Sequence, residues 1–335
     1  MVTKRKLILD CDPGTDDSIC ILMALTYPDV ELLAITTESG NLTSDKTSSN
    51  ALKILEYMGR TDIPVAKGML HPLVRPQPSD PYSHGDDGLG NHFFPQPHTA
   101  LANRHAALMI IDLVKKYPGE VSLVCTAPLT NLALAIILAP EIVPMIHKVY
   151  HLGGAYGFSK YAFTHATGDN CVSEWNVFVD PEAAKIVYSA GLNLTTIGLD
   201  IAYRGDTNIL PETQEKIRRL GNKQAVYTLE TLSYIEKAQS DLEEGTYIKG
   251  TIDTVAMCAF LRPDMIKTKT IKVAIDTGTD LTRGATIWDR RIWNRNNRKL
   301  SAMEFFEIES AYDMDGALYQ QVYYEALGGF ATAAE

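Results

Sequence analysis

Cysteine is scarce in this 335-residue chain, and basic residues are outnumbered by acidic ones. The five cysteines are scattered, odd in number and without a CxxC pair, which argues against a disulfide framework or a thiolate zinc site and favours a reducing, cytoplasmic compartment. The formal net charge of −10 means that nucleic acid or an anionic membrane surface would be repelled. We therefore expect a small-molecule partner.

Long hydrophobic runs are absent as well. The longest, Leu132 to Ala139, is far too short to cross a bilayer. The apolar run that follows the basic residues Lys4 to Lys6 ends at Leu9, well short of the apolar core of a signal peptide. Nevertheless 45% of the residues are hydrophobic, enough for a large core. The sequence predicts a cytoplasmic protein that makes no membrane contact.

Strand-like and helix-like segments alternate from the N-terminus to residue 199. The strand-like segments are residues 6–9, 30–37, 120–125, 147–152 and 194–199, and the helix-like ones are residues 19–25, 43–58, 129–138 and 181–190. Later in the chain, residues 222–240 are typical of a helix and residues 270–274 and 285–288 of strands. Such alternation predicts a mostly parallel sheet with helices on both faces. Because no linker-like composition shift or internal repeat interrupts it, we expect residues 1–335 to form one α/β domain with a Rossmann-like core.

Two stretches, residues 71–100 and 155–173, break this rhythm. Both are rich in glycine and histidine, and the first is too long for an ordinary connection. In open parallel sheets ligands bind beyond the carboxyl ends of the strands. We expect both stretches to lie above that edge and to act as lids over a site.

The most informative feature is a group of aspartates in the string LILDCDPGTDDS: Asp10, Asp12, Asp16 and Asp17. A strand end, a Pro-Gly turn and a helix start bring these carboxylates into one small volume. A helix N-cap explains one or two of them. Like charges that close repel, so a cation is expected, and hard oxygen donors predict Ca²⁺ or Mg²⁺ rather than zinc.

The same string, DCDPGTDD, resembles the N-terminal signature of the nucleoside hydrolase family, calcium-dependent enzymes that cleave the N-glycosidic bonds of ribonucleosides. Further segments are similar to the family's motifs in the same order: TESGN at 37–41, HGDDGLG at 84–90, TAPLTN at 126–131, GG at 153–154, EWN at 174–176, DPEAA at 180–184, TRG at 282–284 and DRR at 289–291. Any one short string is weak evidence, but the ordered set makes chance a poor explanation.

The resemblance implies a site and its chemistry. It implies that Ca²⁺ is held by Asp12, Asp17, the backbone carbonyl of Thr126 and Asp253, and that Asp12 is the catalytic base. It implies substrate contacts, mostly to the ribose hydroxyls, by Asp16, Asn41, His84, Asn170, Glu174, Trp175 and Asn176. Anionic groups suit this reaction because positive charge develops on the ribose ring as the bond breaks. The family's habit further implies a homodimer or homotetramer.

One departure from the family pattern concerns the leaving base. Many pyrimidine and mixed-specificity members carry histidine just before the late aspartate, and purine-preferring members carry tryptophan there. This chain has Ile252, which offers neither a proton nor an aromatic face. Leaving-group activation must then come from His84, His165, Tyr247 or Trp175, or be absent. Trp175 could stack on a purine, so the sequence weakly favours purine ribonucleosides.

Two alternatives stay open at this point. Asp10-Cys11-Asp12 followed by Thr15 also resembles the DxDxT motif of haloacid dehalogenase-type phosphatases, with Asp10 as nucleophile and Asp12 as acid/base. That interpretation gives no reason for the other segments. The second alternative is a nucleoside- or ribose-binding homologue that kept the calcium site and lost turnover, which Ile252 keeps open.

Overall fold

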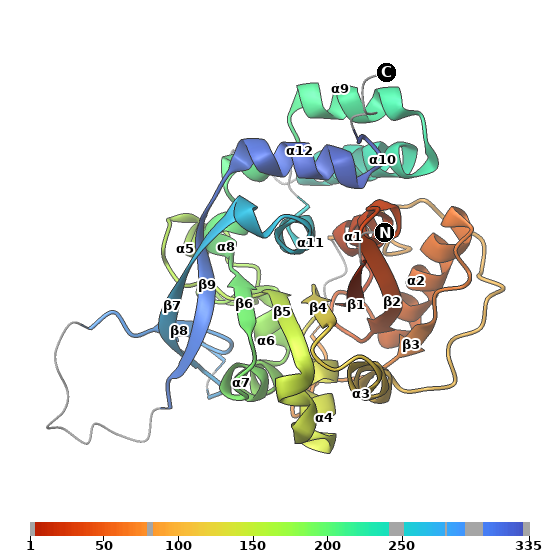
Figure 1. Ribbon diagram of the computed structural model, residues 1–335. Helices are drawn as coiled ribbons and strands as arrows, with labels where there is room; N and C mark the ends of the chain where they lie inside the picture. The colour runs from red at the N-terminus through yellow and green to blue at the C-terminus, as the bar shows by residue number, and fades with distance from the viewer. Residues whose placement is uncertain (1–3, 79–82, 241–250, 279, 292–303, 331–335) are drawn as a thin grey trace, which may run out of the picture.

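The computed structural model describes residues 4–78, 83–240, 251–278, 280–291 and 304–330. In these ranges the strands form one nine-stranded sheet (Figure 1). Their spatial order is β3 (Val65–Lys67), β2 (Val30–Thr37), β1 (Arg5–Cys11), β4 (Val121–Cys125), β5 (Ile146–Leu152), β6 (Leu194–Ile197), β9 (Phe306–Met314), β7 (Ile266–Ile275) and β8 (Thr286–Trp288). The strands from β3 to β9 pair in parallel, whereas β7 and β8 extend the sheet by antiparallel pairing. The predicted mostly parallel α/β fold is confirmed.

Helices cover both faces of this sheet (Figure 1). They are α1 (Thr15–Thr26), α2 (Ser44–Met58), α3 (Ala106–Lys116), α4 (Thr130–Leu138), α5 (Tyr161–Thr164), α6 (Trp175–Val179), α7 (Pro181–Ser189), α8 (Leu199–Ala202), α9 (Pro211–Leu220), α10 (Lys223–Ser240), α11 (Asp253–Leu261) and α12 (Gly316–Ala326). One large apolar cluster joins the sheet to α1, α2, α11 and α12, and a second joins it to α3, α4 and α7. Of the helices in the described part of the chain, none is long and apolar enough to cross a membrane.

Several elements agree with the sequence in detail. Strand β2 has the expected bounds, and α2 ends where Gly59 adopts the left-handed conformation with φ of +70°. The expected N-cap of α7 is present, because the carboxylate of Asp180 accepts a hydrogen bond from the backbone N–H of Ala183 at 2.9 Å. The expected strand at 194–199 was too long, since residues from Leu199 onward turn into the short helix α8.

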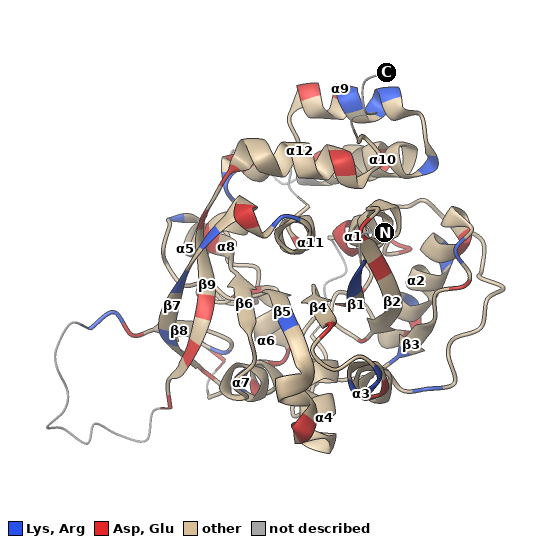
Figure 2. Ribbon diagram, viewed as in Figure 1, with Lys and Arg blue, Asp and Glu red and all other residues tan. Residues whose placement is uncertain are grey.

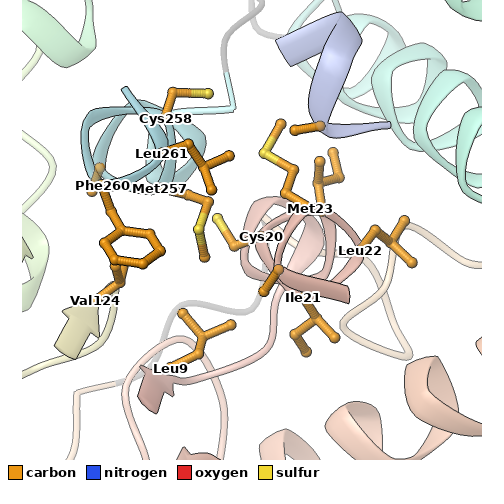
Figure 3. Close-up of a cluster of buried hydrophobic side chains, with 14 of the residues drawn as sticks. Leu9, Cys20, Ile21, Leu22, Met23, Val124, Met257, Cys258, Phe260 and Leu261 are labelled. Atoms are coloured by element: carbon orange, nitrogen blue, oxygen red, sulfur yellow. The ribbon is translucent and has the colours of Figure 1, made fainter. Parts of the chain in front are cut away.

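The packing of α1 against α11 is the feature that positions the site. Figure 3 shows the contact: Cys20 of α1 faces Met257 and Leu261 of α11, with Leu9 of β1 and Val124 of β4 below, whereas Ile21 and Leu22 point away from α11. These side chains are at most 2% exposed, so the two helices are fixed to the sheet and to each other. Their N-terminal ends, which carry Asp16, Asp17 and Asp253, are thereby held together.

The two irregular stretches differ in structure. The described part of residues 71–100 contains no helix or strand, and it is organised by Asp87, whose carboxylate accepts the backbone N–H groups of Leu89, Asn91 and Phe93 at 2.7–2.9 Å. The second stretch contains the one-turn helix α5. Each contributes side chains to the cleft described next, and lid motion stays a prediction.

Candidate active site

A cleft with a volume of about 350 Å³ opens at the carboxyl edge of the parallel strands. The connections that follow β1, β2, β4 and β5 all contribute to it, as expected for an open parallel sheet. Its lining residues are Thr15, Asp16, Asn41, Ser83, His84, Thr126, Leu152, Thr167, Glu174, Trp175, Asn176, Tyr203, Ile235, Ala238, Ile252 and Asp253. Eight of the predicted site residues therefore line one cleft: Asp16, Asn41, His84, Thr126, Glu174, Trp175, Asn176 and Asp253. Asp12 and Asp17 are fully buried and are not among its lining residues.

Three carboxylates meet at the cleft, and two of them, Asp16 and Asp253, line it. One oxygen each of Asp16, Asp17 and Asp253 lie within 4.8 Å of one another, and all three residues are buried. Asp16 and Asp17 come from the first turn of α1, and Asp253 begins α11. The packing of these two helices thus explains how residues 237 positions apart converge, with the backbone N–H of Asp253 lying 3.4 Å from Oδ2 of Asp16.

Asp12 lies next to this cluster, and its carboxylate is oriented by the turn after β2. Its Oδ2 accepts the backbone N–H of Asn41 at 2.5 Å, whereas its Oδ1 is buried and has no hydrogen-bond partner. A Cβ atom at Gly40 would fall 2.0 Å from Asp12 Oδ2, so only glycine permits this close approach. The Gly-Asn pair therefore serves the site as well as the turn.

Asp17 connects three of the turns that build the site. Its Oδ2 accepts the backbone N–H of Gly14 at 3.0 Å and the side-chain amide of Asn41 at 3.1 Å, and its Oδ1 accepts the hydroxyl of Thr126 at 2.7 Å. These bonds join the turns after β1, β2 and β4 through one carboxylate. The position of Asp17 is consequently well determined by the surrounding chain.

The carbonyl of Thr126 is held by a residue of α6. The side-chain amide of Asn176 donates to the oxygen of Thr126 at 2.9 Å and to that of Leu152 at 3.0 Å. Glu174, the N-cap of α6, accepts the backbone N–H groups of Asn176, Val177 and Gly154 at 2.7–3.2 Å. A carbonyl oxygen has two lone pairs, so that of Thr126 can still accept one further ligand.

Burial and mutual repulsion disfavour the charged forms of these carboxylates. Burial, followed by the charge of Asp17, raises the pKa of Asp12 well above its ordinary value, and burial followed by the charge of Asp16 raises that of Asp253. Burial with the charge of Asp16 raises the pKa of Asp17 to about 6, and burial alone raises that of Glu174 to about 7. Such a cluster is stable as a set of anions only when positive charge compensates it.

The residues present fit a hard divalent cation. The unpartnered buried oxygen of Asp12, the convergence of Asp16, Asp17 and Asp253, and the available carbonyl of Thr126 form an all-oxygen donor set. Oxygen donors of this kind suit Ca²⁺ or Mg²⁺. The structure supports a metal site, and the choice of calcium belongs to the proposal below.

The lining of the cleft also includes apolar and aromatic side chains. Trp175 lies there, with its Nε1 buried and without a partner, and its ring stacks on Phe178 with a centroid separation of 6.0 Å. Ile252 lines the same cleft. The Nδ1 of His84 accepts the backbone N–H of Thr15 at 3.1 Å, which assigns the ring proton of the neutral imidazole to Nε2.

Some candidate residues lie elsewhere. Asn170 does not line the cleft: its amide donates to the carbonyl of Arg283 at 2.9 Å, and its Oδ1 accepts from Ser173 at 2.7 Å, so both ends serve loop structure. His165 stacks on Tyr203 at 5.2 Å instead of lining the cleft. Tyr247 is outside the described residues. A sugar contact by Asn170 stays a prediction, and this geometry does not favour it.

Some cleft residues were not predicted from the sequence. Tyr203 follows α8, and Ile235 and Ala238 lie one turn apart on α10. The position of Tyr203 shortly after β6 is a signal that strand-end reasoning could have used. Ile235 and Ala238 carry no such signal, because apolar residues at helical spacing are ordinary core positions.

Comparison with known proteins shows the family to which this chain is similar. The family model described as inosine-uridine preferring nucleoside hydrolase matches residues 7–313. The chain is 38% identical to the inosine-uridine preferring nucleoside hydrolase of Leishmania major over 86% of this chain and 88% of that protein. It is 36% identical to the pyrimidine-specific ribonucleoside hydrolase RihA of Shewanella baltica over 85% and 87% of the two chains. The purine-preferring ribonucleoside hydrolase of Gardnerella vaginalis superposes with a TM-score of 0.80 at 29% identity, over 97% of this chain and 98% of that chain.

These findings define the protein as a hydrolase of N-glycosidic bonds. The chain belongs to the nucleoside hydrolase family. The phosphatase alternative is thereby set aside, and the structure gives a reason. Asp10, its required nucleophile, accepts hydrogen bonds at Oδ1 from Thr36 of β2 at 2.5 Å and from Asn131 of α4 at 3.0 Å, and neither of these residues lines the cleft. Asp10 is also not among the three carboxylates that converge, Asp16, Asp17 and Asp253.

Proposed function

We propose that this enzyme hydrolyses ribonucleosides to ribose and free base in a calcium-dependent reaction, with a weak preference for purines. The observation that carries the proposal is the convergence of Asp16, Asp17 and Asp253, with Asp12 close by, at a cleft of about 350 Å³ that Asp16 and Asp253 line. That volume suits a nucleoside. An anionic floor beneath the ribose stabilises the positive charge that develops on the ring as the glycosidic bond breaks.

Asp12 is the proposed general base. Its Oδ2 is fixed by the N–H of Asn41, and its unpartnered Oδ1 is the atom that would accept a proton from the attacking water. Asp12, Asp17, Asp253 and the carbonyl of Thr126 would hold Ca²⁺. When bound, the ion compensates the carboxylates, so that Asp12 is ionised at neutral pH, and it orders water and the ribose hydroxyls.

The proposed ribose contacts are made by acceptor atoms that the protein's own hydrogen bonds leave available. Both amide protons of Asn176 are used by backbone carbonyls, which leaves its Oδ1 to accept from a sugar hydroxyl. Asp16, Asn41 and Glu174 also line the cleft and can accept further hydrogen bonds. A set of acceptors around the sugar favours ribose over deoxyribose, because a missing hydroxyl leaves an acceptor unpaired.

His84 is the proposed donor to the leaving base. Ile252 has no proton to give, so another residue of the cleft must donate one. The Nδ1 of His84 accepts a hydrogen bond, which leaves its Nε2–H available as the donor.

Trp175 supplies an aromatic face in the same cleft, and the purine-preferring relative from Gardnerella vaginalis has a similar fold. Stacking on the larger purine is the basis of the proposed preference.

The decisive experiment measures ribose release from inosine, adenosine, guanosine, uridine, cytidine and a p-nitrophenyl riboside, before and after calcium chelation. Chelation should abolish release, and added calcium should restore it. If magnesium restores release equally well, the assignment of calcium is wrong. Binding of ribose without release from any substrate would instead favour the binding-homologue alternative.

The base preference has its own test. Trp175→Ala should raise KM for purine nucleosides by about tenfold, a loss on the scale of one aromatic stacking contact, whereas Trp175→Phe should retain most of the affinity. Equal KM values in the two variants would contradict purine stacking by Trp175.

We further propose that the enzyme is a cytoplasmic homodimer or homotetramer. Light scattering during gel filtration would test the number of subunits.

A further inference from the structure

A second cavity, here called the amino-edge cavity, lies at the opposite edge of the sheet. Its volume is about 300 Å³. It is lined by residues at the starts of β1, β4 and β5 and at the end of α11: Lys4, Arg5, Lys6, Gly119, Glu120, Ser122, His147, Lys148, Tyr150, Phe260 and Pro263. Strand β1, seven residues long, separates it from Asp12 by roughly 20 Å at ~3.3 Å per residue. A ligand here cannot touch the reacting atoms of the active site.

The cavity is cationic although the chain as a whole carries a net charge of −10. Four of its lining residues are lysine or arginine, and Glu120 is the one carboxylate among them. Figure 2 shows the corresponding blue segments on β1 and β5, two strands separated in the sheet by β4. Cations that gather in a concave site raise the local concentration of anions.

Two of these cations already have partners. Lys6 pairs with Glu120 at 2.7 Å. Arg5 pairs with Asp29 at 3.0 Å and donates to the carbonyls of Phe260 and Leu261, which end α11, at 2.6 and 3.2 Å. These contacts hold Arg5 and Lys6 in the wall of the cavity. The other two basic residues of the lining are Lys4 and Lys148.

Lys148 is the exception that points to a ligand. It is half-buried on β5, and it forms no ion pair with any residue that the structure describes. Its ammonium lies 5.0 Å from the ring centroid of Tyr150, a contact that replaces only part of the lost hydration. Burial lowers the pKa of Lys148, with a smaller opposing effect from the charge of Glu309. A partly desolvated cation without a bonded anion is stabilised when one binds.

We propose that the amino-edge cavity binds a small phosphate-bearing molecule, with the ammonium of Lys148 in direct contact with the phosphoryl group and Lys4 at the rim. Several cations around one cavity suit a doubly charged phosphoryl group better than a single carboxylate. A volume of about 300 Å³ exceeds that of inorganic phosphate and leaves room for an organic part. A polyanion such as nucleic acid is disfavoured, because its remaining phosphates would face the chain's net charge of −10.

The test is isothermal titration of the calcium-loaded enzyme with glycerol 3-phosphate, which carries no base or ribose to occupy the active site. Inorganic phosphate and a short single-stranded oligonucleotide form two further arms, and sodium chloride at equal ionic strength is the blank. The variants are Lys148→Met, which keeps the aliphatic stem, Lys148→Arg, which keeps the charge, and Lys115→Met as control. Lys115 is a surface lysine paired with Glu141 outside the cavity.

The wild type and Lys115→Met should bind glycerol 3-phosphate alike, and Lys148→Met should bind about tenfold or more weakly, the loss of one charge-assisted hydrogen bond. Lys148→Arg should retain binding. Unchanged melting and ribose release in Lys148→Met would show that the fold and active site are intact. The proposal is overturned if the wild type binds no glycerol 3-phosphate, if Lys148→Met binds it equally well, or if only the oligonucleotide binds.

Discussion

The side-chain amide of Asn176 donates hydrogen bonds to the carbonyl oxygens of Thr126 and Leu152, at 2.9 and 3.0 Å. One side chain from the start of α6 thus joins the turn after β4 to the end of β5 at the carboxyl edge of the sheet. Because the carbonyl of Thr126 belongs to the proposed cation site, this link connects the geometry of the metal site to that of the ribose site.

Replacing Asn176 should therefore damage both sites. Asn176→Ala leaves two buried carbonyls without their donor, and we expect a loss of about 1–3 kcal/mol in the free energy of unfolding. We also expect weaker calcium binding and a kcat/KM lower by about tenfold or more. Chemical denaturation, calcium titration and ribose release measure the three effects.

Asn193→Ala is the matched control. Asn193 also donates to a backbone carbonyl of β5, that of His147 at 3.0 Å, but it is exposed and lies at the other edge of the sheet. Its loss should change stability by less than about 1 kcal/mol and leave calcium affinity unchanged. Equal calcium affinity in Asn176→Ala and Asn193→Ala would refute the link through Thr126.

Asp12→Asn should separate catalysis from folding. The amide keeps an oxygen to accept the N–H of Asn41, but it cannot take a proton from water. We expect kcat to fall by about 10²–10⁴. In chelator, the variant should be at least as stable as the wild type, since the change removes one member of a repelling carboxylate cluster. Ribose release and melting in chelator test both parts; a variant that retains kcat would exclude Asp12 as the base.

Metal removal should reverse the pH dependence of stability. Without a cation, the carboxylates of the proposed calcium site bind more protons in the folded than in the unfolded protein, because the pKa of Asp17 is raised to about 6 and those of Asp12 and Asp253 are raised well above their ordinary values. Their contribution to stability is therefore present at low pH and lost as pH rises through about 6 and above. With calcium, binding requires deprotonated ligands, so its stabilisation grows with pH.

The quantity to measure is the difference in unfolding free energy with and without calcium. It should grow by an amount on the order of 1–3 kcal/mol between pH 6 and pH 8, given 1.36 kcal/mol per unit of pKa shift. His151, whose pKa burial lowers to about 3, acts in the opposite direction, losing stability as pH falls below about 6.5. Its effect cancels in the difference because it is present in both measurements. A difference that does not depend on pH would contradict the carboxylate site.

The parts of the fold and of the site that could be predicted from the sequence are those indicated by residues close together in the chain. The strand, turn and helix that carry Asp12, Asp16 and Asp17 are formed by contiguous residues. The apolar runs on either side and the Pro-Gly pair between them therefore predicted this unit. The approach of Asp253 to Asp16 depends on the packing of α11 against α1 across the core, which no local pattern contains. The family resemblance supplied that contact.

Strand β9 and helix α12 were not predicted from the sequence. In the structure β9 lies between β6 and β7 in the sheet. Such pairing of segments distant in sequence is set by tertiary structure.

Asn170 shows what a family resemblance leaves open. The resemblance implied a sugar contact, and in the structure the side-chain amide donates to the carbonyl of Arg283. A polar side chain in a loop can satisfy the backbone or a ligand, and sequence alone does not distinguish the two.

The last prediction concerns His84 and its close neighbour Gly14. His84→Ala removes the proposed donor to the leaving base, so release from natural nucleosides should fall by about 10²-fold or more. The p-nitrophenyl riboside, whose leaving group needs no proton, should be cleaved at nearly the wild-type rate. A Cβ atom at Gly14 would lie 2.5 Å from His84 Nδ1, so Gly14→Ala should displace the ring and produce the same split between substrates.

The double variant makes this prediction specific. If Gly14→Ala acts by moving His84, it should lower kcat for inosine in the wild type but have little further effect in the His84→Ala background. Additive losses would mean that Gly14 acts through the turn that carries Asp16 and Asp17 and not through the imidazole. Equal losses on inosine and on the p-nitrophenyl riboside in His84→Ala would show that His84 positions the substrate instead of activating the base.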